Sequence, residues 1–339
     1  MKKFFFVFKY NFRRTSFNNF IKVRNIKNFR VYDLSGPLKY YSFGKFIIFF
    51  VQKFHLYFKN CVLISCDAEP ILFKNSINLW FGGTSYKVPQ KFKKLKNNSY
   101  VFENFKKKEQ NLIKFYPHDM SKFYYRKEPK VIFIGEFTDC KYGIINKIWD
   151  LEKKNIFKNF KIIDNKIFWK KYNLDKDKKL QPYYIALKDL LRLNLIIKLN
   201  KKLKNDLIIV GNKWKPFIKS SLKSNYDPNY SKSLYKGNIC IDFGTKWGSN
   251  CLYPRSINII ESGGLLLQSL QSDTKKIFHK NHKDISFNSF NELLKKIKYI
   301  LNNNLKIKNL YNNQYKNFNK NNLNYKNLQK VFTISKKNN

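Results

Sequence analysis

The residues best suited to bind a small anionic ligand lie between residues 237 and 303. Glycine turns let a ligand approach the backbone closely, and basic side chains hold phosphate groups. The small, polar and charged residues of this stretch are Gly244, Thr245, Lys246, Gly248, Ser249, Arg255, Glu261, Ser262, Gly263 and Gly264. Residues of these types predict a site for a phosphate-bearing ligand.

Strands and helices that alternate along the chain must position these residues. The β-type runs are Ile239 to Phe243, Leu265 to Gln268 and Asp284 to Phe287, and segments of helical period are Arg255 to Ser262 and Phe290 to Leu301. This alternation predicts an α/β fold with a parallel sheet. Ligands of such sheets bind beyond the carboxyl ends of the strands, so we expect the site at that edge.

The order of short motifs resembles the C-terminal half of GT-B glycosyltransferases. Arg255-x5-Glu261-Ser-Gly-Gly-Leu-Leu-Leu is similar to the pattern R-x-F-E-x-x-A-S-G-G-x-L-L of the CgeB-like, glycosyl transferases group 1 family. Upstream, Tyr116-Pro-His-Asp119 and Val131-Ile-Phe-Ile-Gly135 resemble that family's passage from its first domain into its second. The resemblance covers about Val101 to Leu301.

Two Rossmann-like domains that face each other across a cleft are what this resemblance implies. We expect an acceptor domain over residues 1–124, a nucleotide-sugar domain over residues 125–309, and a C-terminal helix with a basic tail over residues 310–339. The first domain has candidate strands of its own at Phe4 to Phe8, Phe29 to Tyr32, Cys61 to Ser65, Ile77 to Phe81 and Tyr100 to Phe102.

The resemblance also implies how a nucleotide-sugar donor would be held without a metal ion. Lys246 and Arg255 would be the cations beside the diphosphate, and Gly263 and Gly264 would let the backbone approach it. Glu261 would accept hydrogen bonds from the ribose hydroxyls, as that family's pattern implies.

Two further residues of the second domain, Gly135 and Trp214, are candidates whose roles the sequence leaves undecided. Gly135 ends a buried strand and would offer backbone N–H groups to an anion, but Glu136 follows it where relatives have a small residue. Trp214 either stacks on the nucleotide base or belongs to the core.

Candidates for proton transfer lie nearer the amino terminus. Asp67, just past the run Cys61 to Ser65, is either a general base or a helix N-cap. The family's pattern would place His118 at the mouth of the cleft, where it either acts on donor phosphate or in proton transfer, or tethers the linker with Asp119.

The charge of the chain suggests other partners. The 339 residues hold 68 Lys and Arg against 22 Asp and Glu, a formal charge of +46. Such a charge attracts nucleic acid or an anionic membrane surface. However, the chain is also rich in Asn, Ile, Phe and Tyr, so a bias toward A/T-rich codons explains much of the basicity, and we do not expect a nucleic-acid partner. The helical segment Ala186 to Lys204 is basic and amphipathic, which leaves either peripheral membrane contact or ordinary core packing.

Composition limits the remaining classes. The mean hydropathy is −0.53 and no apolar run approaches 18 residues, so we expect a soluble, cytoplasmic protein, either free or peripheral to the inner face of the cytoplasmic membrane. The five cysteines lack C-x-x-C spacing, and we predict no metal and no cofactor.

The resemblance to the glycosyltransferase family implies the expected function, transfer of a sugar from a nucleotide-sugar donor to an envelope glycan or lipid-linked acceptor. Two alternatives remain at this stage. One is a basic nucleic-acid-binding protein of an organelle or ribosome, and the other is a GT-B scaffold that binds nucleotide without turnover.

Overall fold

The computed structural model describes the chain in two parts. Before residue 124 it describes the backbone of six strands, and beyond it residues 124–137, 143–159, 166–174, 176, 180–225, 228–244, 254–270, 274–275, 278 and 281–320. Its contacts divide the chain into two compact units, residues 1–119 with 322–339, and residues 120–321. Each unit is described below by itself.

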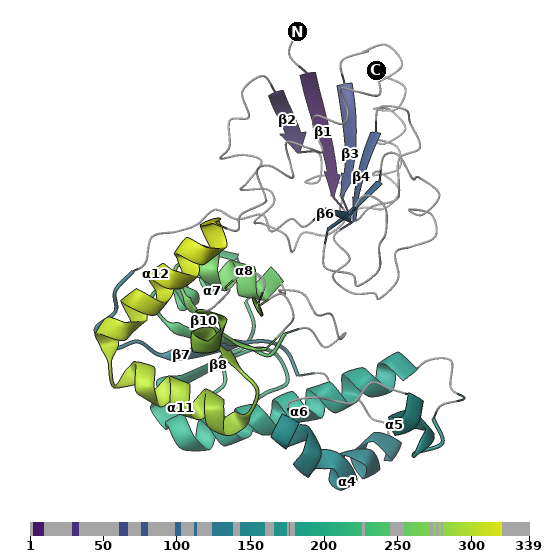
Figure 1. Cartoon of the computed structure of the whole chain (residues 1–339), viewed down its shortest axis with the longest axis vertical. Helices are drawn as coiled ribbons and strands as arrows, with labels where there is room; N and C mark the ends of the chain where they lie inside the picture. The colour runs from purple at the N-terminus through teal and green to yellow at the C-terminus, as the bar shows by residue number, and fades with distance from the viewer. Residues whose placement is uncertain are drawn as a thin grey trace. The chain divides into compact units, whose positions relative to one another are not determined.

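The described strands of the first unit form one parallel sheet in the order β2-β1-β3-β4-β5-β6 (Figure 1). They are β1 Lys3–Lys9, β2 Phe29–Asp33, β3 Cys61–Cys66, β4 Ser76–Trp80, β5 Ser99–Phe102 and β6 Leu112–Ile113. The predicted strands of this region are thus present, each shifted by no more than one residue at either end.

The second unit contains a parallel sheet whose described strands have the order β11-β10-β9-β7-β8. They are β7 Val131–Ile134, β8 Leu207–Val210, β9 Ile239–Asp242, β10 Leu265–Ser269 and β11 Ser286–Phe287. Outside β8, Leu222 forms a single parallel bridge with Val210. The strands are short runs of mostly Ile, Val and Leu, as expected for a parallel sheet covered on both faces. The α/β class predicted from the sequence is confirmed for this unit.

The described helices of the second unit surround this sheet or extend from it. They are α4 Gly143–Asn159, α5 Lys166–Lys170, α6 Leu180–Leu203, α7 Pro228–Tyr235, α8 Pro254–Glu261, α10 His282–Ile285, α11 Phe290–Leu301 and α12 Asn304–Lys320, with a 3-10 turn at Lys204–Asp206. The run Asp284 to Phe287, predicted as one strand, is instead the end of α10 followed by the two residues of β11.

Helix α6 links two hydrophobic cores (Figure 1). Its second half, with Ile196 and Leu199, belongs to the core that covers one face of the sheet. Its first half, with Leu187, packs with Trp149 of α4 and Trp169 of α5. The apolar side chains of both halves of α6 are thus packed inside the protein. This favours ordinary core packing of the helix over contact with a membrane. The helix also begins six residues before the predicted Ala186.

A hydrogen-bonded carboxylate joins α4 to the end of α5. Glu152 Oε1 accepts hydrogen bonds from Lys171 Nζ at 2.7 Å and from the Tyr172 hydroxyl at 2.6 Å. The Lys171 bond first, and then the Tyr172 bond, hold the pKa of the Glu152 carboxyl below its usual range. This contact therefore lies beside the core that α4, α5 and the first half of α6 form together.

Strand β11 pairs only with the last two residues of β10, and helix α12 bonds to backbone groups nearer the start of β10. The side chain of Gln314, 1% exposed, accepts from the backbone N–H of Leu266 and donates to its carbonyl oxygen. The Tyr311 hydroxyl donates to the carbonyl of Ile260. The described part of this helix therefore packs on the second unit, and it begins at Asn304 rather than at the predicted residue 310. Residues 321–339 lie outside the described part.

Candidate functional site

The sheet of the second unit has one position where its strand order reverses. In chain order its strands run 2-1-3-4-5 from β8 to β11, so the chain leaves β7 toward β8 and later returns to the other side of β7 as β9. Ligands of open α/β sheets bind in the crevice at the carboxyl ends of the strands at this position. Here those ends are Gly135 and Glu136 after β7, and Asp242 to Gly244 at the end of β9.

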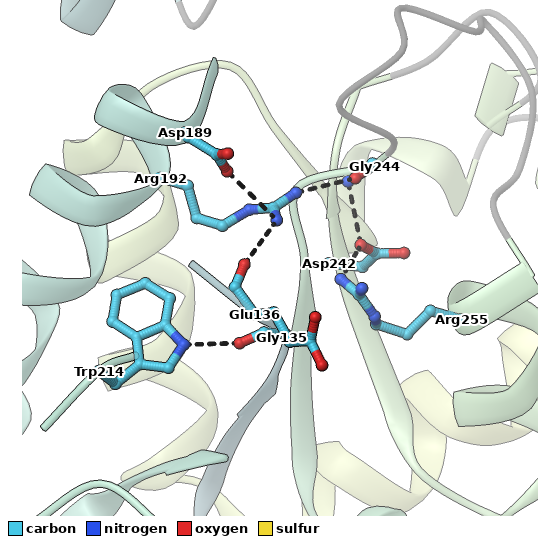
Figure 2. Close-up of polar contacts among 8 residues, drawn as sticks. All are labelled: Gly135, Glu136, Asp189, Arg192, Trp214, Asp242, Gly244 and Arg255. Atoms are coloured by element: carbon cyan, nitrogen blue, oxygen red, sulfur yellow. Dashed lines mark hydrogen bonds and ion pairs between the residues drawn. The ribbon is translucent and has the colours of Figure 1, made fainter. Parts of the chain in front are cut away.

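Asp242, the last residue of β9, bonds to several of its neighbours at this edge of the sheet. Its side chain is fully buried, and Oδ1 accepts from the Gly244 backbone N–H at 3.0 Å and from Arg255 Nη1 at 3.4 Å. Oδ2 accepts from the Ser256 hydroxyl at 2.5 Å. Gly244 has a φ of 75°, a conformation that favours glycine. One carboxylate thus fixes the turn after β9 and the first turn of α8 together (Figure 2).

Arg192 of α6 connects the two strand ends. Its guanidinium donates to the carbonyl oxygen of Glu136 at 3.5 Å and to that of Gly244 at 3.4 Å. The side chain is 6% exposed and lies 4.0 Å from the carboxylate of Asp189, which is 1% exposed. A planar guanidinium with several donors can hold two carbonyls at once, which the ammonium of lysine does less well. Figure 2 shows this bridge above the ends of β7 and β9.

The turn after β7 is fixed from below by Trp214. The indole Nε1 donates to the Gly135 carbonyl at 2.6 Å, and the ring packs on Phe133 and Phe137. Gly211 lies against the same carbonyl, since a Cβ atom there would come within 2.1 Å of the Gly135 oxygen. These contacts leave the turn little freedom to move.

Arg255 lies over Gly135. A Cβ atom on Gly135 would be 3.5 Å from Arg255 Nη1, an ordinary contact distance, and 3.0 Å from the Phe133 ring, so the guanidinium lies directly beside the strand end. The Arg255 side chain is 20% exposed, so a ligand can reach it. Two residues that the sequence predicted for the donor site, Gly135 and Arg255, are therefore brought together.

Glu136 and Asn212 form a polar pair beside this position. Glu136 is exposed, and its Oε1 accepts from Asn212 Nδ2 at 3.3 Å. The backbone N–H of Phe137 also donates to the Asn212 carbonyl, which joins the segments that follow β7 and β8. In Figure 2 the Glu136 carboxylate lies on the opposite side of the strand end from the Trp214 indole.

The charge at this edge differs from that of the chain as a whole. The chain has about three basic residues for each acidic one, yet among the described residues three carboxylates, those of Glu136, Asp189 and Asp242, gather here with two guanidiniums. Both cations are arginines in a chain that uses far more lysine. The edge therefore resembles a site for a ligand with both hydroxyl and anionic groups more than a face for a simple polyanion.

Trp214, predicted either to stack on a base or to belong to the core, is a core residue. It is fully buried, so no face of its ring is open to a nucleotide base. The donor-binding reading of Trp214 is therefore wrong, and its role is to hold the carbonyl of Gly135.

Glu261, Gly263 and Gly264 lie at the opposite edge of the sheet. Helix α8 returns the chain to the amino end of β10, where the Gly237 N–H donates to the Gly263 carbonyl. A Cβ atom on Gly264 would come within 2.7 Å of the Tyr235 carbonyl oxygen. The length of β9, about 10 Å, separates these residues from Gly244. Their prediction at the carboxyl edge is wrong: Gly263, with a φ of 79°, lies in the turn from α8 into β10, and Gly264 lets the chain pass close to the end of α7.

Some predicted residues cannot be placed. They are Asp67, which follows β3 in the sequence, His118, Thr245, Lys246, Gly248 and Ser249, and all lie outside the described residues. Their predicted roles stay predictions.

Asp242, Asn212 and the bridging role of Arg192 were not predicted from the sequence. Asp242 looked like one more strand residue, and Arg192 like one of several cations on a helix. The sequence holds two signals for the role of Arg192. It is an arginine in a chain that ordinarily uses lysine, and Asp189 lies three residues before it. A charged pair with this spacing lies on one face of a helix.

Comparisons with known proteins add no family to this description: no protein-family model matches the chain, and no curated protein matches it significantly. Among the described residues, no group of three or more His, Cys, Asp or Glu side chains is placed to hold a metal ion. None of the described helices is both long enough and apolar enough to cross a membrane.

Proposed function

We propose that the protein is a glycosyltransferase of the GT-B type that transfers a sugar from a nucleotide-sugar donor, without a metal ion, to an envelope glycan or lipid-linked acceptor. The observation that carries the proposal is the position of Arg255. A partly exposed guanidinium lies over a glycine at the carboxyl ends of two parallel strands, where the strand order reverses.

The strand order supports a nucleotide-binding role for the second unit. If Leu222 is counted as a one-residue strand beside β8, the order becomes 3-2-1-4-5-6. This is the order of the Rossmann fold, which binds dinucleotides at the reversal between its first and fourth strands. Those strands are β7 and β9 here. The parallel sheet of the first unit is what a second Rossmann-like domain for the acceptor requires.

The chemistry of the edge suits a departing diphosphate. As the sugar leaves, negative charge grows on the phosphate oxygens, and a cation already held in place stabilises that charge without reorganising. Asp242 holds Arg255 from its buried side, and Gly135 leaves room in front of it. Lys246, in the segment between Gly244 and α8, is the second cation that the proposal assigns to the diphosphate.

One departure from the family pattern bears on the ribose. The pattern has its Glu three positions after its Arg, and Asn258 occupies that position here. Asn258 is partly exposed and lies on the same face of α8 as Arg255. An amide can bond to a hydroxyl but lacks the charge of a carboxylate, so ribose binding in this chain needs another group.

Thermal unfolding with UDP-, GDP-, ADP-, CMP- and dTDP-sugars at high salt tests the proposal. Ligand at about a hundred times its dissociation constant adds roughly 2.7 kcal/mol, which raises the Tm of a unit of this size by about 5 to 11 °C. We expect one nucleotide to give this rise and Arg255→Gln to remove it, while Lys295→Gln, an exposed cation on α11, keeps it.

The same experiment separates the alternatives. If no nucleotide sugar shifts the Tm but low-salt RNA does, the protein binds polyanions and the proposal is wrong. If a nucleotide sugar binds but its sugar is neither transferred nor hydrolysed, the protein is a nucleotide-binding scaffold, and only the catalytic part of the proposal fails.

A further inference from the structure

The pair Glu136 and Asn212 lies where a nucleotide at this edge would place its ribose. In Rossmann folds an acidic residue beyond the end of the second strand hydrogen-bonds the ribose hydroxyls. The second strand here is β8, and the polar residue just beyond it is Asn212, whose side chain is neutral. The carboxylate that Asn212 lacks is supplied by its hydrogen-bond partner Glu136, from the end of the neighbouring strand.

We propose that Glu136 and Asn212 together bind the vicinal 2′ and 3′ hydroxyls of the donor's ribose. The inference rests on the proposed function, because it takes a nucleotide to be the ligand of this edge. It replaces the sequence-based assignment of that role to Glu261, which lies at the opposite edge of the sheet.

The chemistry of the two side chains fits a diol. An ionised carboxylate has two oxygens that can each accept a hydrogen bond, so it can bind two neighbouring hydroxyls at once. Hydrogen bonds to an ionised acceptor are stronger than neutral ones, and the Asn212 amide holds one oxygen of the carboxylate in place. In Figure 2 the Glu136 carboxylate and the Arg255 guanidinium lie on the same side of Gly135, so the hydroxyls and the phosphate of one nucleotide would bind next to each other.

The backbone beneath the pair is held rigidly enough to select a ligand. Arg192 holds the carbonyl of Glu136, Trp214 holds that of Gly135, and the Phe137 N–H holds that of Asn212. A ribose is joined to its diphosphate through a single methylene group, so the groups that bind the two must be close neighbours. Glu136 adjoins Gly135 in the chain, and Arg255 lies over Gly135.

The test compares nucleotides with and without the diol. Isothermal calorimetry would measure the Kd of UDP, GDP and ADP and of their 2′,3′-dideoxy analogues. For the nucleotide that binds, we expect the wild-type protein to prefer the ribose form by about tenfold or more, as loss of hydrogen bonds to a charged group implies. Glu136→Ala should bind both forms equally and the dideoxy form about as well as wild type, and Asn212→Ala should reduce the preference.

Glu128→Ala is the matched control, because Glu128 is also exposed but precedes β7, at the opposite end of the strand. It should keep the full preference. If a nucleotide binds but wild type shows no preference, or if Glu136→Ala keeps it, the diol assignment is wrong and the proposed function is unaffected. If none of these nucleotides binds and the full nucleotide-sugar panel gives no rise in Tm, the proposed function fails, and the diol assignment fails with it. If only a dTDP-sugar binds, the diol assignment alone is wrong, because dTDP has no 2′ hydroxyl.

Discussion

Replacing Asp242 by Ala removes the carboxylate that organises the β9 side of the edge. Two buried groups lose their acceptor, the backbone N–H of Gly244 and the hydroxyl of Ser256. A buried polar group left without a partner costs about 1–3 kcal/mol, so the two together cost about 4 kcal/mol. Arg255, which is 20% exposed, can turn to water and adds little.

Asp242→Asn is the companion variant that separates shape from charge. The amide keeps an oxygen for the Gly244 N–H, and the Ser256 hydroxyl can rotate to accept from the new amide nitrogen. The loss is then mainly the charge opposite Arg255, so we expect about 1 kcal/mol. The difference between the two variants, about 3 kcal/mol, measures what the buried acceptors contribute.

Urea unfolding followed by tryptophan fluorescence measures both values. In the described part of the second unit the buried reporters are Trp149, Trp169 and Trp214. For a unit of this size the Asp242→Ala loss also corresponds to a fall in Tm of about 8–16 °C. If both variants lose less than about 1 kcal/mol, Asp242 does not hold the edge together, and the argument that Arg255 is preorganised fails.

Other parts of the second unit yield further predictions. Gln314→Leu leaves two buried backbone groups of β10 unpaired and should lower the unfolding free energy by about 2–4 kcal/mol in urea titration. Gly264→Ala brings a methyl group into the backbone and should destabilise by about 2 kcal/mol or more, whereas Gly143→Ala, with nothing within 4 Å, should be neutral or slightly stabilising; thermal unfolding compares the two. The hydrogen bond from Lys171 lowers the pKa of Glu152, so its stabilisation is present above the ordinary value of 4.5 and is lost as pH falls below it; urea titrations over this range should show a weaker pH dependence in Glu152→Gln.

Sequence patterns predicted the strands of the second unit better than its helices. Runs such as Val131 to Ile134 and Leu265 to Gln268 are mostly apolar and each adjoins a glycine, and both match the observed strands within one residue. Helix α11 also matches, because Ser289 and Glu292 form a capping pair at its start. Helix α6 begins six residues before the predicted Ala186, and Pro182 lies in its first turn, where proline is tolerated.

The candidate site was only partly predictable. Gly135 and Arg255 follow from rules about strand ends and cations, and the structure brings them together. Glu261 and Gly264 were misplaced because they are close to Arg255 in sequence, whereas the helix between them carries the chain about 9 Å along its axis to the other edge.

Contacts between distant segments could not be predicted from one sequence. Arg192 and Gly244 are 52 residues apart, and Trp214 and Gly135 are 79 apart. No periodicity or spacing rule connects such pairs, since only the tertiary fold brings them together. The indole of Trp214 illustrates this, because a tryptophan after a strand has the same local pattern whether it faces a ligand or the core.

Hydrogen exchange followed by mass spectrometry, with and without the nucleotide sugar that raises the Tm, tests the central claim most directly. The account predicts slower exchange on binding in peptides that contain Gly135 to Phe137, Gly244 and the start of α8 at Arg255. Peptides that contain Gly263 and Gly264 should be unchanged, because those residues lie at the other edge of the sheet. Protection at Gly263 and Gly264 without protection at Gly135 and Gly244 would contradict the account, because the ligand would then bind at the amino ends of the strands.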